Sequence, residues 1–236
     1  METVEGRDHF DLIIVGCGIA GASLAHFLGE RGVSDVLMLE REEQPGYHAT
    51  GRSAAILLEI DAIPSALTFK RLAAPFLREP PPGFAERPLL EANGILVLLQ
   101  GPAWGLVEKA VPGFAAAGVA IEALSPSEIL DRIPVLTPGL FDGGVLLPES
   151  GHIDVHELLS SYLRHARRRG AELRTNVKVE GIAVERGRCV GVITPAGEIR
   201  ARWVVNAAGA WAGESARLAG AAPIPMRPLR RTAITF

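Results

Sequence analysis

Blocks of apolar and polar residues near the start of the chain are typical of a strand, a tight turn, a helix and a second strand. Residues 10–15, FDLIIV, form a continuous apolar run that ends at a glycine, as expected of a buried parallel strand. Residues 19–31 have apolar side chains at helical spacing, and residues 36–40, VLMLE, are typical of the next strand. We therefore expect the chain to open with a βαβ unit.

A different pattern occupies the middle of the chain, after the proline-rich connector EPPPGF at 79–84. Residues 94–99 and 143–148 are apolar runs that predict strands, and residues 108–118 and 125–133 predict short helices between them. We expect this region to form a layer of its own.

The last third of the chain returns to the first pattern. The segment GHIDVHELLSSYLRHARRRG predicts an amphipathic helix, because its apolar side chains recur at helical spacing. Four strand-like runs follow it, at residues 171–179, 181–186, 189–195 and 202–209. These elements are expected to join the opening βαβ unit in one α/β domain.

Composition and charge restrict the class of protein. The 236 residues are 48 % hydrophobic and 22 % charged, which is typical of a soluble globular protein. The net charge of −3 argues against a nucleic-acid-binding surface, and the apolar runs are too short to span a bilayer. Two cysteines and no recognisable signal peptide favour a reduced, cytoplasmic setting.

The turn after the first predicted strand has the glycine spacing of a dinucleotide-binding motif. In GCGIAG, Gly16 permits a tight turn, Gly18 lets the backbone approach a pyrophosphate, and Gly21 lets helix and strand pack closely. Glu40 ends the next strand about 20 residues further on, where a carboxylate binds a ribose. The alternative is a tight turn with a surface glutamate. Both NAD and FAD suit the motif itself.

A second stretch of small residues, VVNAAGAW at 204–211, follows the last predicted strand. Ala207, Ala208 and Gly209 leave the backbone bare, which suits either close helix–strand packing or a flat ligand or phosphate lying against it. The loop QPGYHATGRSAA at 44–55 has small residues, hydroxyls and an arginine. It either lines a pyrophosphate and a flat ring or is an ordinary polar loop.

Together these motifs resemble the D-amino-acid-oxidase-like family of FAD-dependent oxidoreductases, which includes glycine oxidase, sarcosine oxidase and D-amino-acid dehydrogenases. The matching pieces, which cover most of the chain, are IIVGCGIAGAS, LEREEQPGYHATGRSAA, GHIDVHEL, the strand around Val177, and VVNAAGAWA. Within the family, QPGYHATGRSAA, PPPGFAERPLL and PLRRTAITF look most similar to D-arginine dehydrogenases.

The resemblance implies FAD as the cofactor and an α/β fold. A Rossmann-like FAD-binding domain with a parallel sheet would be joined to an incomplete antiparallel-sheet substrate domain. The implied boundaries are 1–85 and 150–222 for the two parts of the FAD-binding domain, 86–149 for the substrate domain, and 223–236 for a strand that returns to it.

The resemblance also implies which residues contact FAD. In chain order they are Gly16, Gly18, Ala20 and Gly21 at the pyrophosphate; Glu40 at the adenosine ribose and Arg41 near the adenine; Ala49, Thr50, Gly51, Arg52, Ser53, Ala54 and Ala55 beneath the flavin and its phosphates; Val177 at the adenine through its backbone; and Ala207, Ala208 and Gly209 at a second approach to the dinucleotide.

The implied reaction transfers a hydride from the carbon that bears an amine to flavin N5, and leaves an imine that water hydrolyses. A guanidinium pairs bidentately with a substrate carboxylate. The family pattern favours Arg230 over Arg231 for this catalytic contact, although two surface arginines fit the sequence equally well. His48 either carries a covalent flavin, as histidines do in some relatives, or is a hydrogen-bonded loop residue, which is the favoured interpretation. No cluster of residues predicts a metal site.

Two features depart from the family pattern. After GRSAA, the residues Ile56, Leu57 and Leu58 stand where the most similar relatives have polar and aromatic side chains, which argues against arginine as the substrate. The chain also ends at Phe236, where family members continue, so a truncated chain with uncertain activity of its own is expected.

The sequence therefore favours an oxidoreductase that acts on a C–N bond in a small amine or amino acid. The alternatives are a flavin-dependent 2-hydroxy-acid dehydrogenase and a non-catalytic FAD-binding fragment. The sequence leaves the electron acceptor open.

Overall fold

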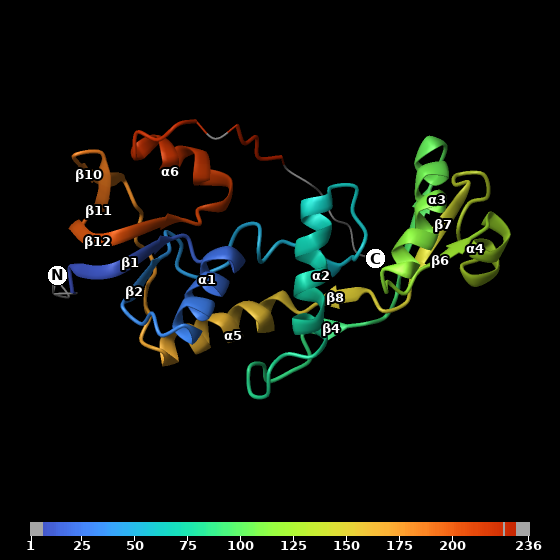
Figure 1. The fold of residues 1–236 in the computed structure, drawn as a ribbon, viewed down its shortest axis with the longest axis horizontal. Helices are drawn as coiled ribbons and strands as arrows, with labels where there is room; N and C mark the ends of the chain where they lie inside the picture. The colour runs from blue at the N-terminus through green and yellow to red at the C-terminus, as the bar shows by residue number, and fades with distance from the viewer. Residues whose placement is uncertain (1–6, 224, 230–236) are drawn as a thin grey trace. The chain divides into compact units, whose positions relative to one another are not determined.

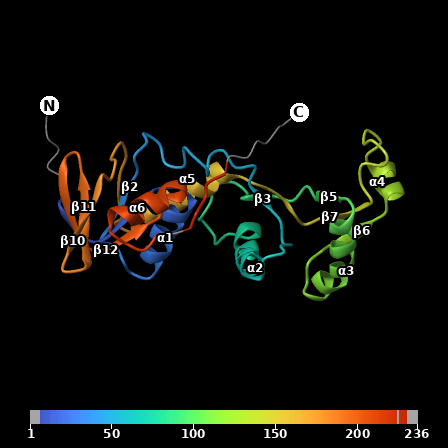
Figure 2. The same ribbon diagram turned by 90° about the horizontal axis from the view of Figure 1, so that it is seen from above.

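The computed structural model describes residues 7–223 and 225–229, and it divides the chain into two compact units. Unit 1 consists of Met1–Ser53 and Val155–Phe236, and unit 2 consists of Ala54–Asp154. Figures 1 and 2 show the helices and strands of each unit. Residues 54–85, which the sequence assigned to the FAD-binding domain, group with unit 2. Since compactness does not identify the residues that contact a cofactor, the domain boundaries stay a prediction.

Unit 1 is built on a six-stranded sheet in the order β10-β11-β12-β1-β2-β9. The parallel strands are β12 (Gly197–Asn206), β1 (His9–Val15), β2 (Val36–Leu39) and β9 (Glu172–Arg174). An antiparallel hairpin of β10 (Gly181–Glu185) and β11 (Arg188–Thr194) extends the sheet beyond β12. The expected α/β class with a parallel-containing sheet is confirmed.

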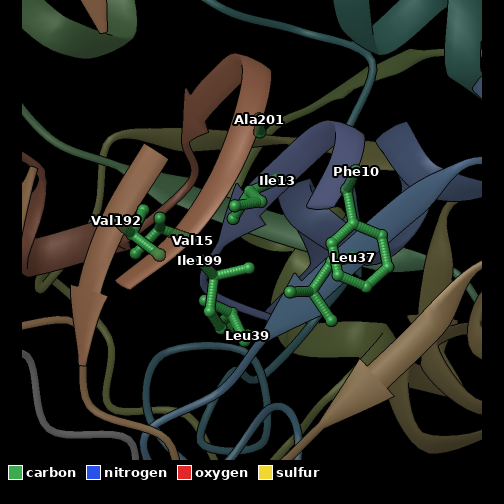
Figure 3. Packing of buried hydrophobic residues seen from close by; sticks show 8 residues of the cluster. All are labelled: Phe10, Ile13, Val15, Leu37, Leu39, Val192, Ile199 and Ala201. Atoms are coloured by element: carbon green, nitrogen blue, oxygen red, sulfur yellow. The ribbon is translucent and has the colours of Figure 1, made fainter. Parts of the chain in front are cut away.

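Both faces of this sheet are apolar, because central parallel strands are covered on both sides. Figure 3 shows the packing on one face, made by Phe10, Ile13, Val15, Leu37, Leu39, Val192, Ile199 and Ala201. On the other face, Ile14 and Met38 pack with Ala25 of α1 (Ile19–Glu30) and Ala166 of α5 (Val155–Arg168). The helices α1 and α5 contact each other over this face (Figure 1).

The carboxyl ends of the parallel strands meet at one edge of the sheet. Val15 of β1 is in register with Asn206 of β12 and with Leu39 of β2. The alignment continues for one more residue, because the Gly16 N–H donates to Leu39 O at 2.8 Å and the Ala207 N–H donates to Val15 O at 2.9 Å. The two small-residue motifs are therefore neighbours in space, at the edge where such sheets bind ligands.

Unit 2 contains two small antiparallel sheets. The first has the order β3-β8-β4, with strands Ile56–Leu57, Gly151–Ile153 and Leu90–Glu91, and the second has the order β5-β7-β6, with strands Ile95–Leu99, Gly143–Leu147 and Glu122–Leu124. The helices are α2 (Pro64–Arg78), α3 (Pro102–Ala116) and α4 (Pro126–Arg132). The predicted helix at 108–118 is the second half of α3, which begins earlier because Gly101 and Pro102 form its start.

Two further observations concern membrane-spanning helices and the residues that the structure does not describe. In the segments that the structure describes, no helix has both the length and the apolar character needed to cross a bilayer. Arg230, Arg231 and the predicted strand TAITF lie outside the described residues.

Candidate functional site

A pocket lies at the carboxyl edge of the unit 1 sheet, and every residue that lines it belongs to unit 1. Its cavity volume is about 220 Å³, and the space rises to about 1050 Å³ when the part open to solvent is included. Typical small-molecule pockets measure roughly 300–1,000 Å³. A dinucleotide bound here would therefore extend into the part that is open to solvent.

The first wall of the pocket is the turn between β1 and α1. Gly16 has φ +101°, and a Cβ placed on it would approach Ala207 O to 2.5 Å. A Cβ on Gly21 would overlap the carbonyl oxygen of Gly16. The bare residues of the two motifs thus pack against each other, and Gly16, Ala207 and Ala208 also line the pocket. At this edge of the sheet, the same bare residues pack against each other and leave backbone open to the pocket.

Gly18, the residue just before α1, lines the pocket, and the first N–H groups of α1 follow it. The Ile19 N–H donates to Thr50 Oγ1 at 3.0 Å, which leaves the Thr50 hydroxyl proton available to donate elsewhere. Within residues 7–223 and 225–229, no protein acceptor pairs with the N–H groups of Gly18, Ala20 or Gly21. Unpaired N–H groups at a helix N-terminus favour an anion. This turn fits a pyrophosphate.

Glu40, at the end of β2, places a buried carboxylate beside the turn, since only 7 % of the residue is exposed. Its Oε2 accepts the Cys17 N–H and its Oε1 accepts the Glu42 N–H, both at 3.1 Å. A carboxylate has about four acceptor positions, so it can also accept from the hydroxyls of a ribose. Burial, with the nearby Glu40 carboxylate, raises the pKa of Cys17, so this thiol stays protonated and acts as a small filler.

Four side chains from three segments form what we call the Trp211 cluster, Arg41, Glu42, His48 and Trp211, and all of them except Glu42 line the pocket. The Arg41 guanidinium lies 4.4 Å from the centre of the Trp211 ring, and the His48 ring lies 4.6 Å from it. Glu42 Oε1 is 3.0 Å from Arg41 Nε and 2.8 Å from His48 Nε2. The hydrogen bond with His48, followed by that from Arg41, lowers the pKa of Glu42. His48 is thus hydrogen-bonded within the loop, and the choice between this role and a covalent flavin stays a prediction.

The structure brings most of the predicted FAD contacts together. Those that line the pocket are Gly16, Gly18, Glu40, Arg41, Ala49, Thr50, Val177, Ala207, Ala208 and Gly209. The backbone N–H of Val177 donates to Glu40 O at 2.8 Å, so its carbonyl is the group left for an adenine. All of these contacts with FAD stay predictions.

The other predicted residues do not line the pocket. Gly21 is buried behind the turn and Ala20 lies on the first turn of α1. Gly51, Arg52 and Ser53 are exposed, and Arg52 lies 5.0 Å from the centre of the Tyr47 ring instead. Ala54 and Ala55 belong to unit 2. Arg230 lies outside the described residues.

The sequence did not identify the far wall of the pocket. This wall is made by Tyr47, Lys178, Val179, Ala210, Trp211, Glu214, Ser215 and Leu218. Several of them lie on η1 (Gly209–Trp211) and α6 (Ala212–Leu218), the short helices after β12. The tryptophan next to the bare AAG motif was the only local signal for them. In the described part of the chain, no group of His, Cys, Asp and Glu side chains is arranged to hold a metal ion.

Comparison with known proteins places this chain in a family. Residues 11–236 match a family model described as FAD dependent oxidoreductase. Human mitochondrial dimethylglycine dehydrogenase is 26 % identical over 227 residues, which are 91 % of this chain and 25 % of that protein. The 4-methylaminobutanoate oxidase (formaldehyde-forming) of Paenarthrobacter nicotinovorans is 28 % identical over 90 % of this chain and 26 % of its own length. Escherichia coli L-2-hydroxyglutarate dehydrogenase is 25 % identical over 91 % of this chain and 51 % of its own.

Solved structures share the fold. L-proline dehydrogenase from P. horikoshii has a TM-score of 0.79 at 22 % identity, covering 91 % of this chain and 57 % of that one. Glycine oxidase from Bacillus cereus has a TM-score of 0.73 at 24 % identity, covering 88 % of this chain and 59 % of that one. The chain therefore spans between about a quarter and three fifths of the length of these proteins.

Proposed function

Because its residues 11–236 match the family model, the chain belongs to the FAD-dependent oxidoreductases, and we propose that it takes part in oxidising a C–N bond in a small amine or amino acid. The family resemblance and the FAD cofactor expected from the sequence are confirmed. The closer similarity to D-arginine dehydrogenases stays a prediction. The observation that supports the cofactor in this proposal is one pocket that joins the glycine turn, Glu40 and the AAG motif.

When bound, FAD supplies the electron acceptor, a flavin N5 that takes a hydride. The residues of this chain would hold it in place. The N–H groups at the start of α1 would bind the pyrophosphate, and the carboxylate of Glu40 would accept hydrogen bonds from the ribose. The apolar members of the far wall, Val179, Trp211 and Leu218, would help to exclude water from the bound adenosine. These contacts would hold the cofactor in one orientation. The rate of hydride transfer would then depend on how the substrate is positioned against it.

The substrate class is proposed from two observations. Two of the curated relatives are named for dimethylglycine and 4-methylaminobutanoate, which are small methylated amino acids. In unit 2, Leu57 is buried and Leu58 packs against the core around Val145, so the run after Ala55 offers few polar groups. The carboxylate of Glu59 in the same run is already paired with Arg78. A cationic side chain would find no free acid there, which favours a small amino acid over arginine.

The test is an anaerobic titration of the purified 236-residue chain loaded with FAD. We expect dimethylglycine, sarcosine or another small amino acid to bleach the blue absorbance band of the flavin, and to reduce an artificial dye in steady-state turnover. A chain that binds FAD and is bleached by none of these compounds would instead support the non-catalytic alternative.

Arg230 is the proposed catalytic contact for the substrate carboxylate. Arg230→Lys should raise KM for an amino acid roughly 10- to 100-fold, because lysine cannot replace a bidentate pair. Arg231→Lys is the matched control and should leave KM within about twofold. A larger rise in KM for Arg231→Lys than for Arg230→Lys would assign the contact with the substrate carboxylate to Arg231.

A flavin-dependent 2-hydroxy-acid dehydrogenase is the second candidate, favoured by the match to L-2-hydroxyglutarate dehydrogenase. The same titration separates the two candidates. Bleaching by 2-hydroxyglutarate without bleaching by any amine or amino acid would replace the first proposal with the second.

A further inference from the structure

The Trp211 cluster connects segments that are far apart in the chain. Arg41 and Glu42 follow β2, His48 lies in the loop after them, and Trp211 ends η1 beyond β12. In the sheet order, β1 lies between β2 and β12. The contact between Arg41 and Trp211 therefore spans the end of β1, where the glycine turn begins.

Glu42 is the residue that holds this cluster together. A single oxygen, Oε1, accepts from both Arg41 Nε and His48 Nε2. The backbone of Glu42 is fixed on both sides, because its N–H donates to Glu40 Oε1 and its carbonyl accepts the Asn176 N–H at 3.0 Å. Glu42 itself does not line the pocket, whereas Arg41, His48 and Trp211 all do.

The cluster forms a boundary of the pocket and does not fill it. A cavity of about 220 Å³ is present while all four side chains are in contact. A planar guanidinium against an indole is attractive and leaves flat surfaces on which an aromatic base can stack. This wall stands beside Glu40 and Val177, on the β2 side of the glycine turn that suits the pyrophosphate.

We propose that Glu42 is a positioning residue for the adenosine end of FAD. By holding Arg41 and His48 against Trp211, it fixes the wall beside the adenine and slows the release of the cofactor. The proposal rests on the FAD cofactor and not on the identity of the substrate. It is therefore tested by binding alone, which keeps it separate from the proposed reaction.

The test compares variants with the wild-type 236-residue chain in two measurements. Titration calorimetry gives the Kd of ADP and of FAD, and stopped flow gives the rate of FAD release. Glu42→Gln should raise the Kd of ADP and that of FAD by a similar factor of roughly 10, because it removes the negative charge that strengthens the two hydrogen bonds to Arg41 and His48. The FAD release rate should rise by a comparable factor. The matched control is Glu43→Gln, an exposed glutamate on the same loop, which should change neither Kd.

Two variants of Trp211 separate positioning from a general loss of structure, and they carry the test if Glu42→Gln does not fold. Trp211→Phe keeps a ring for Arg41 and should retain ADP affinity within about threefold, whereas Trp211→Leu should lose about as much affinity as Glu42→Gln. The proposal is overturned if Glu42→Gln weakens FAD but not ADP, if it weakens neither, or if the wild-type chain shows no saturable ADP binding.

Discussion

Single residues at the pocket act through both packing and exposure of the backbone. Gly16 lacks a side chain because Ala207 O occupies the space where a Cβ would be, and because its φ of +101° is a region that side chains rarely adopt. The same absence opens the turn to a ligand. Glu40 likewise has two roles, since its carboxylate ties the turn and the Trp211 cluster together and still has acceptor positions left.

Gly16→Ala tests the close contact at this turn. We expect it to lower the free energy of unfolding by about 2–4 kcal/mol, from backbone strain and overlap with Ala207, and to abolish FAD binding. Gly32→Ala is the matched control, because Gly32 has φ +82° but no atom within 4 Å of an added Cβ. The control should cost only about 1 kcal/mol and leave FAD affinity unchanged. Urea unfolding and flavin titration check both, and equal costs would contradict a specific role for the contact.

Among the elements of unit 1, the contact between α1 and α5 contains a buried histidine. His26 of α1 is only 2 % exposed, and its ring lies 4.8 Å from Phe27 and 5.3 Å from Tyr162 of α5. The titratable groups around it are Glu30 on α1 and Tyr162, His165 and Arg169 at α5 and its end. Burial is the largest cause and lowers the pKa of His26, while burial raises the pKa of Tyr162 to about 12.

This lowered pKa predicts a pH dependence of stability. Below the ordinary histidine value of 6.5, the unfolded chain binds a proton that folded His26 resists, so the free energy of unfolding should fall as the pH drops. Above that value His26 is neutral in both states and its contribution is constant. His26→Gln removes the titration, and its stability should vary less between pH 7.5 and pH 5, as measured by urea unfolding at each pH. If the stability of His26→Gln varied with pH as much as that of the wild type, the pH dependence would come from other groups.

At the scale of the whole molecule, the candidate pocket belongs to one of two compact units. Its lining comes from residues on both sides of the inserted unit 2, so the insertion does not interrupt the pocket. Curated relatives and solved structures match about nine tenths of this chain, and the chain spans a smaller share of their lengths. The expected cytoplasmic setting stays a prediction.

Hydrogen exchange measured by mass spectrometry tests whether FAD binds to the pocket of unit 1. With FAD at about 100 times its Kd, the folded pocket should gain about 2.7 kcal/mol of stability. We expect slower exchange in peptides that contain residues 12–22, 36–50 and 204–211, and little change in peptides of unit 2 from residue 64 to residue 150. Protection confined to unit 2 would mean that FAD binds elsewhere.

Local patterns in the sequence were sufficient for the elements that position the site. Glycine spacing, apolar runs and the acid after the second strand predicted β1, α1 and β2 nearly to the residue, because each depends on interactions within a short segment. The AAG motif was recognised for the same reason. The sequence left open whether its bare backbone serves packing or a ligand.

Only the tertiary structure shows that this backbone packs against the glycine turn and also lines a pocket, whereas its contact with a ligand stays a prediction. The register of β12 on β1 brings Ala207 against Gly16, and the end of β12 turns Trp211 back to Arg41 and His48. Contacts of this kind join residues far apart in the chain, and no local periodicity encodes the partner of a given side chain. The sequence by itself thus determined the glycine turn and the acid that ends the second strand, whereas strand pairing across the sheet determined which side chains enclose the pocket.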